Sequence, residues 1–124
     1  MEQRARPSAQ PLDVMTLFRR LWSRMLNRPA TSPNPMEMVQ YLLDKSNELG
    51  GRDDCAMDLC EFDHPEVEAA LVTVASDAAE EEIVVDSAGE SLAQIFKRQN
   101  RVVPAEILRI LQPSAKKFFE RPDA

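Results

Sequence analysis

Cys55, Cys60 and His64 have the spacing C-x4-C-x3-H, which is a candidate arrangement for binding a metal ion. Within a helix, a separation of five positions places two side chains about 140° apart around the axis, so the two thiols would point in different directions. A structural zinc site also needs four ligands, and no fourth ligand lies at a suitable spacing. We therefore expect no metal ion and no other cofactor, and we interpret the three residues as two small core positions and a helix start.

Nucleophilic catalysis is the second chemistry that these residues suggest, because cysteine and histidine can act as nucleophile and base. The sequence contains no serine-nucleophile motif, no glycine-rich phosphate loop and no dinucleotide-binding fingerprint. Acid–base catalysis would then depend on carboxylates, and Asp and Glu on helix surfaces ordinarily stay solvated and ionised. We expect that the protein is not an enzyme.

The acidic side chains are concentrated in the middle of the sequence. Residues 1–34 carry six basic and two acidic side chains, residues 35–96 carry two basic and sixteen acidic ones, and residues 97–124 carry seven basic and three acidic ones. A negative field of this kind repels nucleic acid and attracts basic proteins. The sequence therefore predicts a basic protein partner and no nucleic-acid binding, with the alternative that the acids only keep the helices soluble.

The composition favours one small helical domain. The chain has 124 residues, 44% of them hydrophobic, and its three glycines and 6% aromatic residues are too few for a β-sandwich or barrel. No apolar run is long enough to span a membrane, and the N-terminus lacks the pattern of a secretory signal. A disulfide between two cysteines of one short helix is geometrically unfavourable, which favours a reducing compartment. We expect a cytoplasmic protein.

The sequence divides into five segments. Residues 1–12 are polar and contain two prolines, which predicts a disordered tail. Residues 13–28 have helical periodicity, and residues 29–34 form a proline-rich linker. We expect a helical repeat domain over residues 35–119, followed by a short tail at 120–124.

The segment 13–28 predicts an amphipathic basic helix. We favour the interpretation that it caps the open end of a helix stack. The runner-up interpretation is a membrane-surface anchor, because aromatic side chains oppose arginines. The residues that carry both interpretations are Phe18, Arg19, Arg20, Trp22 and Arg24.

The first helix of the main domain has a strong start signal, because Asn34, Pro35 and Glu37 supply an N-cap residue, a proline at the first helical position and an early acid. We expect the pair Gly50-Gly51 to end this helix. Its predicted apolar face consists of Met38, Tyr41, Leu42, the stem of Lys45 and Leu49.

Four further helical stretches follow. We expect the first at Asp53–Phe62 and the second to begin at another capping box, Asp63-His64-Pro65-Glu66. The third should run from Ile83 to about Arg98, and the fourth over Pro104–Phe119 with a break at Pro113. Helical periodicity in the two middle stretches predicts the core residues Val67, Ala70, Leu71, Val74, Ala75, Val84, Ala88, Leu92 and Ile95.

Two of these stretches form an internal repeat. A shift of 33 positions aligns DDCAMDLCEF (53–62) with DSAGESLAQI (86–95), and similar helix openings occur at PMEM (35–38), HPEV (64–67) and PAEI (104–107). Small residues at equivalent positions let neighbouring helices approach closely, which justifies a glycine inside a helix. The equivalent positions are Cys55 and Ala88, Ala56 and Gly89, Leu59 and Leu92, and Cys60 and Ala93.

The stretch DHPEVEAALVTVASDAAEEEIVVDSAGESLAQI (63–95) resembles a HEAT-like repeat, with a proline and an acid at the start of one helix and a small-residue and leucine core in the next. The resemblance covers roughly residues 35–111, and the long acidic turn departs from the usual pattern. It implies an all-α fold, a short right-handed α-solenoid of about two and a half helix pairs after an N-terminal amphipathic helix. It also implies a concave face formed largely by the second helices.

The second helices carry the candidate binding residues. Asp54, Asp58 and Glu61 follow i, i+4, i+7, and Asp86 and Glu90 follow i, i+4; we call these five residues the acidic face. Like charges at this spacing destabilise an isolated helix by about 0.2–0.5 kcal/mol, a cost that is easier to understand if a basic partner docks there. In the repeat alignment the two rows are offset by one position, about 100° of rotation, so they overlap only in part.

We therefore expect a protein-interaction module, monomeric or in a heterocomplex, that holds a basic protein on an acidic surface. Its most concrete form is a bacterial immunity or inhibitor protein that neutralises a toxin by electrostatically steered binding. The alternatives are a scaffold or regulatory subunit of a larger enzyme assembly, as HEAT-like domains provide in lyases, and a peripheral membrane adaptor.

Overall fold

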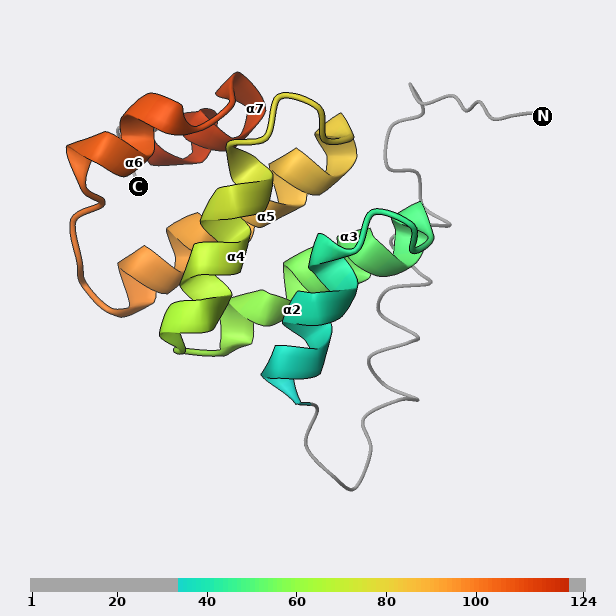
Figure 1. The fold of residues 1–124 in the computed structure, drawn as a ribbon. Helices are drawn as coiled ribbons and strands as arrows, with labels where there is room; N and C mark the ends of the chain where they lie inside the picture. The colour runs from blue at the N-terminus through green and yellow to red at the C-terminus, as the bar shows by residue number, and fades with distance from the viewer. Residues whose placement is uncertain (1–33, 121–124) are drawn as a thin grey trace, which may run out of the picture. The chain divides into compact units, whose positions relative to one another are not determined.

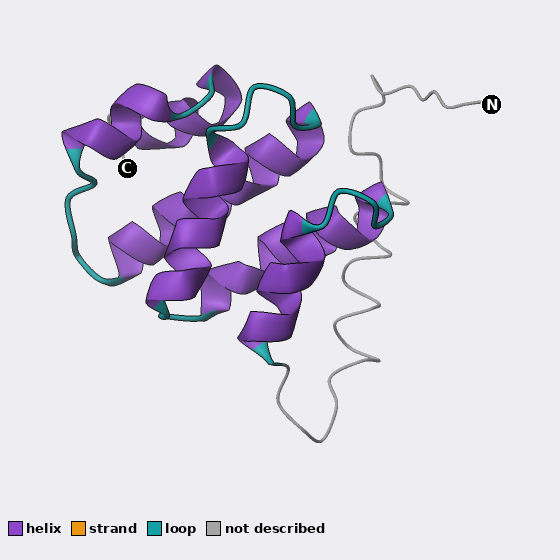
Figure 2. Cartoon of the chain, in the orientation of Figure 1, coloured by secondary structure: helices purple, strands orange, loops and turns teal. Residues whose placement is uncertain are grey.

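The computed structural model describes residues 34–120 (Figure 1). The predicted tail at 1–12, the basic helix at 13–28 with its five candidate residues, most of the linker at 29–34, and the last four residues lie outside this range. The described residues contain helices and loops and no strand (Figure 2), which confirms the all-α prediction for this part of the chain. The helices are α2 (Pro35–Leu43), α3 (Leu49–Asp58), η1 (Leu59–Glu61), α4 (Pro65–Ala75), α5 (Glu82–Arg98), α6 (Ala105–Ile110), α7 (Pro113–Lys116) and η2 (Lys117–Phe119), where η denotes a 3₁₀-helix.

The helices α2, α3, α4 and α5 pack in two layers. α2 contacts α3 and α4, and α5 also contacts α3 and α4, so α2 and α4 form one layer and α3 and α5 the other (Figure 1). α3 and α5 run in the same direction, because Asp53 meets Ser87 and Ala56 meets Ser91 further along both helices. α7 packs on the far side of α5. We call the contact of α2 and α3 with α4 and α5 the first junction, and the contact of α4 and α5 with residues 99–119 the second junction.

The core lies between the two layers. Its largest fully buried side chains come from α2, η1, α4 and α5: Leu42, Leu59, Val67, Leu71, Val84, Leu92 and Ile95. All nine core residues predicted for the two middle stretches are buried, which confirms the helical periodicity there. The apolar run at the start of α5 is helical as well, and not a strand.

The predicted boundary between the first two helices was wrong. α2 ends at Leu43, and the glycine pair lies in the first turn of α3, which begins at Leu49. The chain turns earlier because the Asp44 carboxylate accepts hydrogen bonds from the backbone N–H of Ser46 at 3.0 Å and from its hydroxyl at 2.6 Å. The predicted apolar face was wrong in part for the same reason, since Tyr41, Lys45 and Leu49 are exposed and Val39 is buried with Leu42.

Two glycines lie where a neighbouring element approaches closely. A Cβ atom at position 51 would lie 2.6 Å from the hydroxyl oxygen of Tyr41, and a Cβ atom at position 89 would lie 2.5 Å from the Cα atom of Ala115. The prediction that small residues allow close helix packing is thus confirmed at Gly89, where α5 meets α7.

The helix starts follow the sequence signals in part. Asn34 is an N-cap residue as predicted, since its side-chain oxygen accepts the N–H of Met36 at 2.9 Å. α4 begins at Pro65 as predicted, but the capping box does not form: the N-cap residue is His64, and its side chain makes no capping hydrogen bond. The side chain of Asp63 instead accepts hydrogen bonds from the end of α5.

The C-terminal helical stretch breaks where proline predicts it. α6 ends at Ile110, Leu111 and Gln112 are extended, and α7 begins at Pro113. This extended segment is joined to the end of α4, because the N–H of Gln112 donates to the carbonyl of Ala75 at 2.9 Å. None of the helices within residues 34–120 has the length and apolar character needed to cross a membrane.

Candidate functional site

The first row of the acidic face lies on α3 and η1. The buried side of α3 faces α2 and α5, while Asp54 and Asp58 are half-buried on the other side and engage in further polar interactions. Glu61, at the end of η1, is exposed. This row therefore combines one exposed carboxylate with two half-buried ones.

The second row lies on the exposed stripe of α5. Asp86 is half-buried and Glu90 is exposed, whereas Ala88 and Leu92 on the opposite side of the helix are completely buried. α3 and α5 run parallel in one layer, so the two predicted rows lie on neighbouring helices.

The thiol of Cys55 lies close to two negative charges on α3. Burial, followed by the negative charges of Asp58 and Asp54, raises the pKa of this thiol to about 11. Cys55 and Cys60 are not joined by a disulfide. A thiol with this pKa is a poor nucleophile near neutrality, since very little of it is thiolate.

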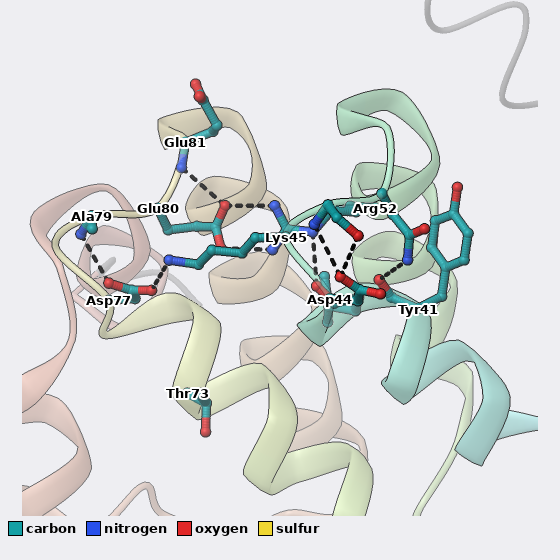
Figure 3. A network of polar contacts seen from close by, with 12 residues as sticks. Tyr41, Asp44, Lys45, Arg52, Thr73, Asp77, Ala79, Glu80 and Glu81 are labelled. Carbon is teal, nitrogen blue, oxygen red and sulfur yellow. Dashed lines mark hydrogen bonds and ion pairs between the residues drawn. The ribbon is translucent and has the colours of Figure 1, made fainter.

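A buried ion pair at the first junction had no counterpart in the sequence predictions. The guanidinium of Arg52 on α3 donates two hydrogen bonds to the carboxylate of Glu80, from Nη1 at 2.8 Å and from Nη2 at 2.7 Å (Figure 3). Its Nε donates to the carbonyl of Leu42 at 2.8 Å. The two charged side chains are only 4% and 2% exposed. Arg52 therefore ties the end of α2 and the loop between α4 and α5 to α3.

The charges of this pair hold each other ionised. Hydrogen bonding to Glu80 raises the pKa of the Arg52 guanidinium above its ordinary value, against the opposing effect of burial. Burial by itself raises the pKa of the Glu80 carboxyl, but the hydrogen bonds from Arg52 and from the N–H of Glu81 outweigh it and leave that pKa lowered. The bidentate geometry is the strongest form of such a contact.

A more exposed ion pair lies beside the buried one. Lys45, in the loop after α2, donates to the carboxylate of Asp77 at 2.6 Å, and Asp77 also accepts the N–H of Ala79 at 2.9 Å (Figure 3). These bonds, with that from Lys45 first, lower the pKa of the Asp77 carboxyl. The two loops that follow α2 and α4 are thus joined at one edge of the stack.

At the second junction, Arg101 is placed by a left-handed turn at the end of α5. Asn100 has φ +56°, its N–H donates to the carbonyl of Lys97 at 3.0 Å, and the N–H of Arg101 donates to the carbonyl of Phe96 at 2.9 Å. This pattern is a Schellman cap, which needs a residue that tolerates positive φ. The turn places the Arg101 guanidinium 4.4 Å from the centroid of the Phe96 ring and 2.9 Å from a carboxylate oxygen of Glu68.

An open hollow of about 560 Å³ lies between α4, the end of α5 and α6. Its lining combines apolar side chains, which include Val72 and Ile107, with polar ones, which include His64, Glu68 and Arg101. Glu68 and Arg101 pair with each other, so they offer little uncompensated charge to a ligand.

Five ion pairs within residues 34–120 follow one pattern. In each, the acid lies between positions 63 and 86 and the base lies before or after that segment. They are Lys45–Asp77 and Arg52–Glu80 at the first junction, Arg101–Glu68 and Lys117–Asp86 at the second, and Arg98–Asp63 between the end of α5 and the residue before the N-cap of α4. The segregation of charge along the sequence thus serves, in part, to join neighbouring helix pairs.

The three residues of the candidate metal motif do not form a metal cluster. Within residues 34–120, no group of three or more His, Cys, Asp and Glu side chains has an arrangement that could hold a metal ion. The described residues form an all-α fold.

Comparison with known proteins gave no match: no family model, curated protein or solved structure is significantly similar to this chain.

Proposed function

We propose that the protein is a non-enzymatic, cytoplasmic interaction module that binds a basic protein on the acidic face. The observation that carries the proposal is the position of this face. Both rows lie on the layer that α3, η1 and α5 form, opposite α2 and α4, and Glu61 and Glu90 are exposed there. Two residues of the acidic face, Asp58 and Asp54, also contribute to the raised pKa of the Cys55 thiol.

We also propose that the stack is a short HEAT-like α-solenoid. The parallel course of α3 and α5 supports this assignment, because second helices of successive repeats run side by side in the same direction. The most concrete function on such a scaffold is that of an immunity or inhibitor protein, in which an acidic surface attracts a basic toxin at a raised association rate.

The proposal is tested by capture of partners from a cell lysate, followed by mass spectrometry. We compare the wild type with the variant Asp54→Lys, Asp58→Lys, Glu90→Lys and with a control of equal charge change on other helices, Glu37→Lys, Glu66→Lys, Glu106→Lys. We expect one stoichiometric basic protein with the wild type and the control and none with the face variant, at equal helicity by circular dichroism.

Because Asp54 and Asp58 are half-buried, a second variant protects the test against misfolding. The variant Glu61→Lys, Glu90→Lys changes only exposed side chains of the acidic face. If this variant and the triple variant both retain the partner while folded, the acidic face only solubilises the protein and the proposal fails. A basic toxin among the captured proteins would identify the function as inhibition, and a metabolic enzyme would favour a scaffold subunit instead.

A further inference from the structure

One residue of the acidic face is already bound by a cationic side chain of the same protein. The ammonium of Lys117, on η2, lies 2.8 Å from a carboxylate oxygen of Asp86 on α5. The same ammonium lies 5.1 Å from the centroid of the neighbouring Phe118 ring. A lysine flanked by an aromatic ring thus occupies the start of the second acidic row.

Apolar contacts hold this segment on α5 without the help of the charge. Ala115 is completely buried and lies against Gly89, and the ring of Phe119 meets that of Phe96 edge to face, with centroids 6.3 Å apart. Loss of the Lys117 charge therefore leaves η2 in place, and the ammonium can leave Asp86 without unfolding the helix pair.

The ion pair itself is open to exchange. Lys117 is 57% exposed and Asp86 is 39% exposed, so water and salt screen their attraction. A cationic side chain from another protein would make the same ammonium–carboxylate or guanidinium–carboxylate contact, and it could do so only after Lys117 moves away.

We propose that Lys117 is an internal competitor that occupies, on Asp86, the position of a lysine or arginine of the bound protein. This inference rests on the proposed function of the acidic face. Displacement of Lys117 weakens binding by the free energy of an exposed ion pair, so its removal should strengthen binding by about 1.5–5-fold. The competition also favours partners that present a cationic group at this position over proteins that carry only diffuse positive charge.

The test uses the full chain and an octalysine peptide as the probe, with dissociation constants measured by titration calorimetry at low ionic strength. Lys117→Met removes the competing charge, and Lys116→Met is the matched control, because it makes the same change of net charge one residue away. We expect Lys117→Met to bind octalysine about 1.5–5-fold more tightly than Lys116→Met. Addition of Asp86→Asn to Lys117→Met should abolish this gain.

The outcomes separate the two proposals. Equal affinities of the two lysine variants, at wild-type helicity, would overturn the role of Lys117 and leave the acidic face intact. Equal binding of octalysine by the wild type and by the variant Glu61→Lys, Glu90→Lys, or no binding by either, would overturn the acidic face as a surface for cations and the competition with it.

Discussion

The two junctions of the stack use the same charge pattern in different environments. The first junction buries Arg52 and Glu80 almost completely and adds the buried hydroxyl of Ser87, which donates to Asp53 at 2.5 Å. At the second junction, the Arg101 side chain of the pair with Glu68 is 44% exposed, and α6 contains no buried residue. The arrangement of acids and bases is the same at both junctions, but the contribution of each ion pair to the free energy of unfolding depends on its burial.

This difference assigns different roles to the two junctions. A buried bidentate pair costs free energy to desolvate, but loss of either partner leaves an uncompensated charge in the interior. The buried pair Arg52–Glu80 of the first junction should therefore be intolerant of single substitutions, whereas the second junction depends on backbone fit and on the apolar contacts of α7 and η2.

The largest effect is expected for Arg52→Met, which leaves the Glu80 carboxylate buried without its guanidinium. We expect a loss of about 3–5 kcal/mol in the free energy of unfolding, measured by urea denaturation. The double variant Arg52→Met, Glu80→Leu should recover most of this loss, because no buried charge then remains. If the single variant were as stable as the wild type, the two junctions would not differ as described.

The same pair predicts a dependence on pH. The pKa of the Glu80 carboxyl is lowered in the folded state, so its stabilising contribution is complete above the unfolded pKa and is lost as the pH falls through the folded pKa. Unfolding free energies measured from about pH 6 down to pH 3 should therefore decrease, and less steeply for Arg52→Met, Glu80→Leu than for the wild type. Parallel pH profiles would contradict the assignment.

A smaller effect is expected for Gly89→Ala at the second junction. The new methyl group would collide with the backbone of Ala115, and the gain in helix propensity offsets only part of the strain, so we expect a net loss of about 1–2 kcal/mol in urea denaturation. Gly51→Ala is the matched control within the α2–α3 pair, since there the methyl group meets only the exposed Tyr41 side chain, which can move. Equal losses would show that close packing matters as much at both sites.

A third effect concerns the turn that places Arg101. Asn100→Ala should cost about 1 kcal/mol in the free energy of unfolding, because alanine tolerates the left-handed conformation poorly, while Asn100→Gly should retain the stability of the wild type. A loss with glycine as large as that with alanine would mean that the Asn100 side chain, and not its backbone, stabilises the second junction.

The smallest effect is expected for Lys45→Met. Its partner Asp77 is itself partly exposed, so the carboxylate that remains is solvated. We expect the urea midpoint to stay close to that of the wild type. A large shift would mean that exposure does not distinguish this pair from its buried neighbour Arg52–Glu80.

The sequence predicts the middle of the stack well. α4 and α5 are long enough to show clear helical periodicity, and every core position predicted from it is buried. Pro65 and Pro113 mark helix starts, because proline fits the first turn of a helix. The boundary between α2 and α3 could not be predicted in the same way, because Gly51, interpreted as part of a helix stop, lies inside α3 and allows the close approach of Tyr41.

The polar contacts were harder to predict, because they join residues far apart in the sequence. Arg52 and Glu80 are separated by 28 positions, and Glu80 lies among acids that look like a solvated turn. The only available signal was the rarity of bases in the acidic middle of the chain, where Arg52 is one of two. Such a base is a reasonable candidate for a structural ion pair, but its partner depends on the packing of the helices.

The pair Arg52–Glu80 also has an evolutionary consequence. In the α-solenoid that we propose, the chain would lengthen or shorten by duplication and deletion of whole helix pairs. Loss of the α4–α5 unit would remove Glu80 and leave the guanidinium of Arg52 with the carbonyl of Leu42 but without its carboxylate partner. Changes after α5 would not affect this pair. The ancestry of the chain should therefore record indels and rapid divergence after residue 98 more readily than between Arg52 and Glu80.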